Sequence, residues 1–322
     1  GLDPRLAALR DALPGQVLLG SGGVRFHLRE RIGEGGQGWV FTANWDEPGG
    51  VIVIVKVLRP DVFSAETLAR FQREAEVLRR LSQVSRPNPH IVRFFDHAVC
   101  NVPNGRGKET VSLPFTVLEY VRGTTLERVL HEAQNTGLGV ERARRILRQV
   151  VLALSDIHGQ DVVHRDLKPS NILLERDGNI AVAKVTDFGL VKVVDVALQR
   201  TTALAGATLG YAPPEQYEQG NERVSPRTDV FSLAAIVFEM VTGHPAFPQR
   251  AGENPLAAIK RLVSDERPSI TAHVASMPAE LRARGDVVRE LDAQLAKALA
   301  ADPSERHPSV QAFWAAMEPL LR

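Results

Sequence analysis

The sequence lacks the features that would tie it to a membrane, to nucleic acid or to an oxidising compartment. Cys100 is its single cysteine, so no disulfide can form within the chain. The longest strongly apolar stretch, 230–241, is interrupted by Ser232 and Glu239 and is shorter than the roughly 20 apolar residues that span a bilayer. A net charge of +1 gives no electrostatic reason to expect nucleic acid. We therefore expect a cytoplasmic chain without a membrane segment or a nucleic-acid partner, in which Cys100 is buried.

Lysine is also scarce, and the chain does not start with methionine. Only seven of the 39 basic residues are lysines, so each lysine position is more informative. The chain opens with Gly1 and without a signal peptide, and we expect it to be part of a longer protein. At 322 residues it is too long for one simple core, so two lobes or domains are expected.

The first 23 residues are expected to form an N-terminal extension. Asp3-Pro4 followed by leucines at helical spacing predicts a short capped helix, and the glycine-rich stretch 20–23 predicts a joint. Either a packing appendage or a disordered lead-in fits this pattern better than a functional role.

A glycine motif follows in a strand-like region. Gly33, Gly35, Gly38 and Val40 give the spacing G-x-G-x-x-G-x-V. Dinucleotide-binding folds use similar glycines before a helix, but here β-forming residues and a turn at 47–50 follow, which favours a hairpin. Glycines let backbone N–H groups approach phosphates without a Cβ in the way, whereas an ordinary glycine-rich turn is the alternative.

The next segment places a lone lysine inside an apolar strand. Lys56 lies in V-I-V-I-V-K-V-L, where its ammonium is costly to bury unless it is paired. A helix is predicted at 65–81, and Glu74 on the edge of its apolar stripe is the candidate partner. The alternative is a lysine that reaches solvent from an edge strand.

The stretch 162–174 reads V-V-H-R-D-L-K-P-S-N-I-L-L and concentrates polar chemistry between apolar runs. A carboxylate (Asp166), an ammonium (Lys168) and an amide (Asn171) at this spacing can hold a hydroxyl, a phosphate oxygen and a metal ion around one point. A predicted hairpin turn at Asp177-Gly178 follows, and then Asp187-Phe188-Gly189. A charged turn between buried strands is the alternative, but it leaves the fixed spacing unexplained.

Together these motifs resemble the catalytic domain of eukaryotic-like Ser/Thr protein kinases of the bacterial type. The resemblance covers about residues 24–320. It implies an α+β bilobal fold, with a small β-rich N-lobe that has one main helix (24–118), a hinge at about 119–123 and a larger helical C-lobe (119–322). Further helices are expected at 126–135, 140–159 and 229–242.

The resemblance also implies ATP and Mg²⁺ as cofactors. Asp166 would orient the substrate hydroxyl, Lys168 would stabilise the γ-phosphoryl group, and Asn171 and Asp187 would bind the metal. The residues expected to contact or position ATP are Ile32, Gly33, Gly35, Gly38, Val40, Ile54, Lys56, Glu74, Leu118, Glu119, Val121 and Leu173. Ile54 departs from the family, which usually has alanine there as the roof over adenine, so either the larger side chain crowds the nucleotide or the pocket compensates elsewhere.

Lys168 and Thr208 favour Ser/Thr over Tyr substrates. In the family, Lys168 and a bridging Thr208 accompany the catalytic aspartate of the Ser/Thr class. Thr201 and Thr202 are expected regulatory phosphosites, since a phosphate there could bridge Arg165 and Lys192. Self-association for trans-autophosphorylation is also expected.

Three residues are expected to support the fold of the second lobe. The resemblance implies that Glu215 pairs with Arg306. Asp229 is expected to be the N-cap of its helix, an anchor for backbone N–H groups of the 162–174 stretch, or both.

Three other function classes remain to be weighed. A pseudokinase scaffold would have lost one of the charged residues, and none is missing. A small-molecule phosphotransferase uses a similar set of Lys, Asp and Asn residues but usually lacks the 208–215 segment and the Arg306 partner. A non-enzymatic interaction module would leave the ordered motifs unexplained.

Overall fold

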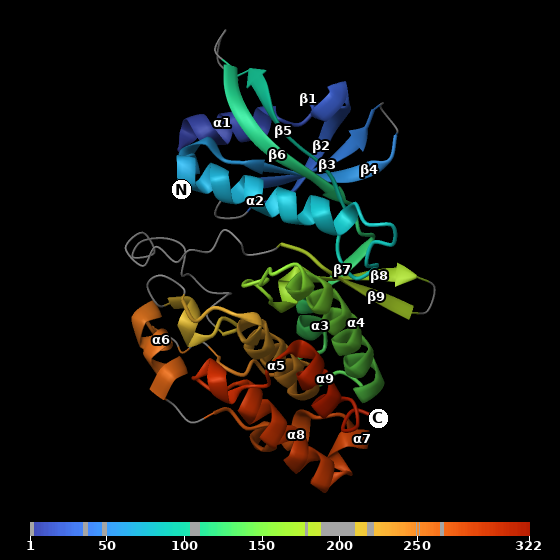
Figure 1. The fold of residues 1–322 in the computed structure, drawn as a ribbon, viewed down its shortest axis with the longest axis vertical. Coiled ribbons are helices and arrows are strands. Elements are labelled where there is room, and N and C mark those ends of the chain that lie inside the picture. Colours follow the sequence, from blue (N-terminus) through green and yellow to red (C-terminus); the bar gives the residue numbers. More distant parts are fainter. Residues whose placement is uncertain are drawn as a thin grey trace. The chain divides into compact units, whose positions relative to one another are not determined.

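The structure is a computed structural model in which the chain divides into two compact units (Figure 1). The first unit holds residues 1–87 and 92–121, and the second holds 88–91 and 122–322. The division after Val121 falls in the segment expected to be a hinge, and the N-terminal 23 residues cluster with the first unit. The described residues are 3–34, 38–46, 50–103, 110–177, 180–187, 210–217, 222–248, 250, 252–264 and 267–322.

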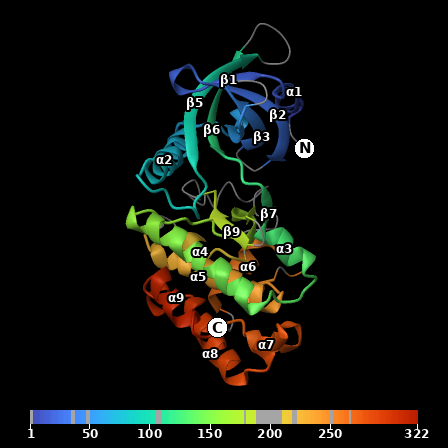
Figure 2. The same cartoon turned by 90° about the vertical axis from the view of Figure 1, so that its right-hand side faces the viewer.

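An antiparallel sheet with strand order β1-β2-β3-β4-β6-β5 forms the first unit. Its two edge strands approach each other: the Leu19 amide nitrogen lies 3.5 Å from Cys100 Sγ, and the Ser21 N–H donates to Asp96 at 2.8 Å. The sheet therefore curls round on itself (Figure 2), and the buried apolar cluster of this unit includes Cys100. The strands are β1 (Val17–Leu19), β2 (Arg25–Glu34), β3 (Gly38–Trp45), β4 (Ile52–Leu58), β5 (Phe94–Pro103) and β6 (Thr110–Glu119).

Two helices accompany this sheet, and both begin at capping residues. Helix α1 (Pro4–Ala12) starts after Asp3, whose carboxylate accepts the Arg5 N–H at 2.7 Å, as the sequence predicts. Helix α2 (Ala65–Ser82) starts after Ser64, which forms a capping box with Thr67, and α2 packs beside β5. The predicted helix at 65–81 is thus confirmed.

The second unit is helical and is organised around α5 (Pro226–Thr242). Every side chain of α5 from Thr228 to Phe238 is buried, in agreement with its predominantly apolar sequence. Helices α4 (Val140–Gly159), α8 (Gly285–Ala298) and α9 (Val310–Met317) pack against it (Figure 1). The other helices are α3 (Leu126–Glu132), α6 (Pro255–Ser264) and α7 (Ala279–Arg282).

A small antiparallel sheet of order β7-β8-β9 accompanies these helices. Its strands are β7 (Gly123–Thr125), β8 (Ile172–Asp177) and β9 (Ile180–Val185). Asp177 pairs with Ile180, so the hairpin predicted at this point is confirmed. The predicted α+β architecture, with a sheet-rich first part and a helical second part, is confirmed as well.

Two predicted helix boundaries are wrong. The helix expected to open at Asp229 begins at Pro226, because Ser225 caps it together with Thr228 and proline suits the first helical position. The helix expected to continue to residue 135 ends at Glu132, and the chain then turns through Gln134 and Asn135 with φ of 51° and 60°.

Candidate active site

Five of the predicted site residues lie outside the described residues, and their roles remain predictions. The others are divided between the two units. The five are Gly35, Lys192, Thr201, Thr202 and Thr208.

One face of the first unit's sheet carries the expected nucleotide-contacting side chains of its central strands. Lys56 on β4 lies opposite Val40 on β3, and Ile54 on β4 lies opposite Leu118 on β6. Directly opposed residues of antiparallel strands project to the same face. The alternate β4 valines are buried in the core on the other face. Lys56 and the unusual Ile54 therefore share one surface.

Gly33 is the second-last residue of β2, and Gly38 is the first residue of β3. Strands β2 and β3 pair antiparallel here, so the predicted hairpin is confirmed. A Cβ on Gly38 would lie 2.5 Å from the Val57 carbonyl oxygen, which only glycine avoids. Ile32, one residue before Gly33, is 52% exposed on β2. The close backbone approach explains the last glycine by sterics alone, independent of any ligand.

The end of β6 presents backbone groups next to Leu118, which is buried. The Glu119 N–H donates to the Arg93 carbonyl at 2.9 Å, and the Glu119 carboxylate accepts the Arg93 N–H at 3.1 Å. The Glu119 N–H is therefore already used within the first unit, and contacts of the Glu119 and Val121 backbones with adenine stay a prediction. Val121 is the last residue of the first unit.

Helix α2 carries the two glutamates considered as lysine partners. Glu74 is half-buried, and Glu76 is exposed and pairs with Arg79 at 2.7 Å, as expected for a solvated residue. The pairing of Lys56 with Glu74 stays a prediction.

In the second unit, Asp229 holds the 162–174 stretch by its backbone. Its carboxylate accepts the N–H groups of His164 at 2.8 Å and Arg165 at 3.0 Å, and it lies 2.7 Å from His158 Nε2. Burial alone would raise the pKa of Asp229, but the hydrogen bonds and charges of these partners lower it. Asp229 is thus an anchor, and the N-cap alternative is wrong because Ser225 caps α5.

His164 links Asp166 to the segment before Asp187. Its Nδ1 accepts the Asp166 N–H at 3.2 Å, so the ring proton is on Nε2, which donates to the Thr186 carbonyl at 2.9 Å. Burial lowers the pKa of His164, in agreement with a neutral ring that accepts at one nitrogen and donates at the other.

The three polar residues of the stretch lie together. Lys168 Nζ is 3.7 Å from Asp166 Oδ2. The Asn171 side-chain amide donates to the Asp166 carbonyl at 2.8 Å and lies 3.3 Å from Asp166 Oδ2. Because the amide nitrogen faces Asp166, the amide oxygen is the atom that Asn171 can offer to a metal ion.

Asp187 lies two residues after the end of β9, and the residue before it is hydrogen-bonded to the backbone of Asn171. The Thr186 N–H donates to the Asn171 carbonyl at 3.0 Å, which brings the two predicted metal ligands to neighbouring backbone. Asp187 has φ of 58°, uncommon for a residue other than glycine. Leu173 on β8 pairs with β9 and is half-buried.

Gln216 is a supporting residue that sequence reasoning missed. It lies in the 3₁₀-helix η5 (Pro214–Tyr217), is 2% exposed, and donates its side-chain N–H to the Arg165 carbonyl at 2.6 Å. Arg165 has φ of 66°, a left-handed conformation that costs an L-residue roughly 1–2 kcal/mol. Asp229 and Gln216 therefore hold this residue from its N–H and its carbonyl. The glutamine after Pro214-Glu215 was visible in the sequence, but nothing there reveals its partner.

The Arg165 guanidinium is half-buried. Its Nε is buried and has no hydrogen-bond partner among the residues that the structure describes. Burial lowers the pKa of Arg165, although Asp229 opposes this effect. A cation in this state suits an anionic partner.

Glu215 and Arg306 form a fully buried ion pair, as predicted. Two guanidinium nitrogens bind the two carboxylate oxygens at 2.7 and 2.9 Å, and Thr228 donates to Glu215 at 2.9 Å. The remaining guanidinium hydrogens reach three backbone carbonyls, so every Arg306 donor is used. The pair fastens η5, which carries Gln216, to the region beyond α8.

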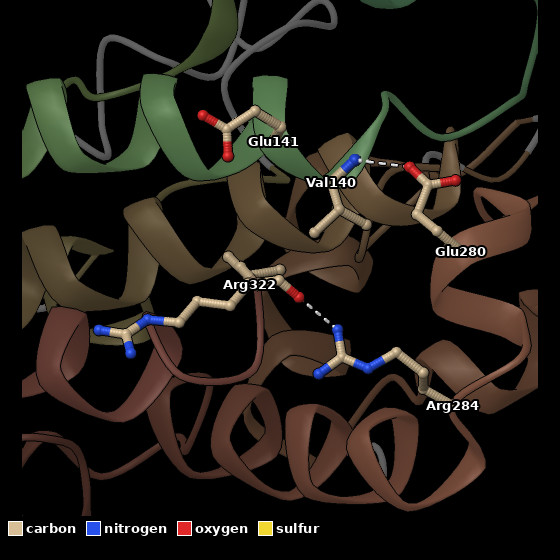
Figure 3. Close-up of a pocket in the computed structure, with 6 residues that line it drawn as sticks. Val140, Glu141, Glu280, Arg284 and Arg322 are labelled. Carbon is tan, nitrogen blue, oxygen red and sulfur yellow. Dashed lines mark hydrogen bonds between the residues drawn. The ribbon is translucent and has the colours of Figure 1, made fainter.

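A pocket in the second unit is lined by residues outside the 162–174 stretch (Figure 3). In it, Glu280 accepts the Val140 N–H at 3.1 Å, and Arg284 donates to the Arg322 carbonyl at 2.5 Å. Glu280 and Arg284 thus bind backbone groups, and the side chains of Glu141 and Arg322 pair with residues three or four positions away in the chain. The lining residues are Val140, Glu141, Glu280, Arg284, Leu321 and Arg322.

Comparison with protein families gives a match to the protein kinase domain over residues 26–315. The chain belongs to the protein kinase family. It resembles Serine/threonine-protein kinase A of Synechocystis, with 32% identity over 91% of this chain and 53% of that protein. It is also 33% identical to Serine/threonine-protein kinase PknB of Mycolicibacterium smegmatis, over 88% of this chain and 41% of that protein. Both relatives are Ser/Thr protein kinases of bacteria, so the chain resembles a bacterial-type Ser/Thr protein kinase catalytic domain.

The kinase domain spans about half of the first of these relatives and less of the second. Its fold is similar to that of the Mycobacterium tuberculosis PknI kinase domain, with a TM-score of 0.67 and 23% identity over 96% of this chain and 98% of that chain. A crystal structure of the same PknI domain gives a TM-score of 0.66 at 24% identity. Within the part of the kinase that the structure describes, no helix is both long and apolar enough to span a membrane.

Proposed function

We propose that this kinase domain transfers the γ-phosphoryl group of ATP to Ser or Thr hydroxyls of protein substrates in the cytoplasm. The observation that carries the proposal is the cluster of Asp166, Lys168 and Asn171, in which Lys168 Nζ lies 3.7 Å and the Asn171 amide 3.3 Å from one carboxylate oxygen. Phosphoryl transfer needs positioning and charge neutralisation more than covalent help, and this cluster supplies both.

Each polar group has a distinct task. Asp166 accepts a hydrogen bond from the substrate hydroxyl and orients its oxygen toward the phosphorus. Lys168, close to Asp166, stabilises negative charge on the transferring group. His164 and Asp229 hold the backbone of Asp166 and Arg165, so the carboxylate is placed before the substrate arrives.

The donor set of Asn171 and Asp187 fits Mg²⁺. This ion prefers oxygen ligands and usually combines one or two protein oxygens with phosphate oxygens and water. The Asn171 amide nitrogen is committed to Asp166, which leaves its oxygen for a metal. When bound, Mg²⁺ would neutralise charge on the ATP phosphates.

The first unit supplies the proposed contacts to the rest of ATP. Lys56, steadied by Glu74, would bind the α- and β-phosphates, while the glycine hairpin covers the phosphates with backbone N–H groups. Ile32, Val40 and Ile54 would contact the base.

The proposal includes regulation by phosphorylation of Thr201 or Thr202. The half-buried Arg165 guanidinium, with its unpartnered Nε among the described residues, supports it, because a phosphate carries a charge of about −1.5 to −2 and strong acceptor oxygens. Lys192 would bind the same phosphate, and Thr208 would then reach the substrate. Modification in trans by a second copy fits this scheme.

The direct test is incubation with Mg-ATP and a Ser/Thr- and Tyr-containing protein mixture, followed by mass mapping of phosphosites. We expect phosphate on Ser and Thr of added protein and on Thr201 or Thr202 of the kinase. Transfer only to small molecules, or ATP binding without any transfer, would contradict the proposed activity.

A second test separates the regulatory proposal from the activity. The Thr201→Ala/Thr202→Ala double variant should lose most activity toward added protein while it still binds ATP. If this variant and the dephosphorylated wild type both work at the full rate, these threonines are not the switch.

A further inference from the structure

Helix α1 is built into the core of the first unit. Leu9 is 3% exposed and Leu13 is 1% exposed, and both belong to the same buried cluster as Trp39. This packing decides between the two expectations for the N-terminal extension, because a disordered lead-in would not bury leucines. Residues 4–25 precede the match to the protein kinase domain, which starts at residue 26, so the helix adds to the family's minimal fold.

Backbone hydrogen bonds fix the end of α1 against β2. The Gly15 N–H donates to the Leu28 carbonyl at 2.9 Å, and the Leu28 N–H donates to the Gln16 carbonyl at 2.9 Å. Strand β1 then pairs with the start of β2. The helix is thus held at a defined place along the strand that leads to the glycine motif.

An ion-pair network joins α1 to the glycine motif itself. Arg10 Nη1 lies 3.1 Å from Glu34 Oε2, and Arg31 Nη1 lies 2.9 Å from the same oxygen. Asp11 accepts from Arg10 Nε at 2.8 Å and holds the guanidinium in place. The side chains of Arg10 and Glu34 are 18% and 29% exposed, so this pair is partly shielded from water, whereas Asp11 and Arg31 are 62% and 38% exposed.

Glu34 is well placed to transmit this contact. It stands directly after Gly33 in the motif and pairs across the hairpin with Trp39, whose side chain is fully buried. Glycine offers no side chain by which a turn can be held, and it loses more conformational freedom than any other residue when ordered. A side chain that anchors the β2 end of the hairpin therefore lowers the entropy that a ligand must otherwise remove.

We propose that α1 positions the nucleotide-binding glycine hairpin and that Arg10 is its positioning residue, acting through Glu34. The inference rests on the proposed function, because the benefit appears when ATP phosphates bind the hairpin. It assigns the N-terminal extension a role in nucleotide affinity in addition to packing. Arg10 itself touches no reacting atom in this account.

The test is a double-mutant cycle of Arg10→Ala and Glu34→Gln, read by the Kd for a non-hydrolysable ATP analogue with Mg²⁺. Arg10→Ala should weaken binding by about two- to fivefold, as expected for one ion pair. Glu34→Gln should weaken binding at least as much, because it also removes the pair with Arg31, and the double variant should be no weaker than Glu34→Gln. Arg10→Lys should recover part of the loss.

Arg5→Ala is the matched control, because Arg5 is an exposed arginine of the same helix. The inference would be overturned if Arg10→Ala bound the ATP analogue with the same Kd as Arg5→Ala. It would also be overturned if the losses of binding free energy in the two single variants added fully in the double variant.

Hydrogen exchange in the ligand-free protein distinguishes this inference from the proposed function. We expect faster exchange in Arg10→Ala than in Arg5→Ala at the paired amides around Gly33–Glu34 and Trp39–Val40. Unchanged exchange there would reject the positioning role. A wild-type protein that binds no ATP analogue would instead reject the proposed function, while the exchange result would still decide whether α1 orders the hairpin.

Discussion

At the scale of single residues, the most informative position is Arg165. Its backbone has a left-handed conformation that residues other than glycine rarely adopt, and two buried side chains hold it there. Asp229 fixes its N–H and Gln216 its carbonyl. Since Asp166 is the next residue, any relaxation of Arg165 displaces the carboxylate proposed to orient the substrate.

Replacing Gln216 with methionine should slow phosphoryl transfer. Methionine keeps the length and burial of the side chain but removes the donor to the Arg165 carbonyl. Loss of one hydrogen bond is worth about 0.5–1.5 kcal/mol, so kcat should fall by roughly 2- to 13-fold while the Kd for nucleotide stays unchanged.

Gln294→Met is the matched control for Gln216→Met. Gln294 is also a hydrogen-bonded glutamine, but its partner is His307, far in sequence from the 162–174 stretch. Steady-state kinetics of both variants, with circular dichroism to verify folding, provide the comparison. A folded Gln216→Met protein with wild-type kcat would show that Asp229 alone sets the loop.

At the scale of elements, the long periodic helices were the most predictable features. Helix α4 spans the range that its apolar spacing predicts, and α2 is one residue longer than predicted. The start of α5 was predicted three residues late, because the Ser225-Pro226 signal lies in a polar stretch and was weighed less than the apolar run. Contacts such as the Gln216–Arg165 bond join distant segments, and no local pattern encodes them.

The buried pair of Glu215 and Arg306 should be a large contributor to the stability of the second unit. Arg306→Ala leaves a carboxylate buried without its cation, which typically costs about 3–5 kcal/mol of unfolding free energy. Urea unfolding followed by circular dichroism measures the loss. Arg289→Ala is the control, because Arg289 pairs with Asp286 in an exposed position on α8. Equal midpoints for the two variants would contradict the account.

His307, which follows η8 (Pro303–Glu305), should make the free energy of unfolding depend on pH in the acid range. Burial lowers the pKa of His307 from 6.5 to about 4, with a smaller effect from Lys297. One ring nitrogen lies 2.8 Å from Gln294 Oε1, and Nδ1 has no partner among the described residues. The folded state therefore takes up this proton less readily than the unfolded state.

Because the pKa of His307 is lower in the folded state, folding stability should decrease as the pH falls. The stabilising effect is complete above pH 6.5 and is lost as pH falls toward about 4, because only the unfolded state is then protonated. The melting temperature of His307→Gln should therefore fall less between pH 7 and pH 5 than that of the wild type. Parallel pH dependences in the two proteins would show that His307 does not contribute.

At the scale of the whole molecule, the sequence predicted the kinase architecture because its motifs keep a fixed order along the chain. It also predicted the cluster of Asp166, Lys168 and Asn171, since short spacing keeps such residues together. It could not predict the role of α1, because the Arg10–Glu34 contact depends on packing between segments 24 residues apart.

The central claim is that Asp166 and Asp187 act on the transferring phosphoryl group. The most direct measurement is transfer of labelled γ-phosphate from Mg-ATP to a Ser/Thr protein substrate by the wild type, Asp166→Asn and Asp187→Asn. Asp286→Asn, which changes an exposed carboxylate on α8, is the control. We predict that the two site variants lose about 100-fold or more of the rate while their melting temperatures stay near that of the wild type, and that the control keeps full activity. Transfer at the wild-type rate by either folded site variant would contradict the account.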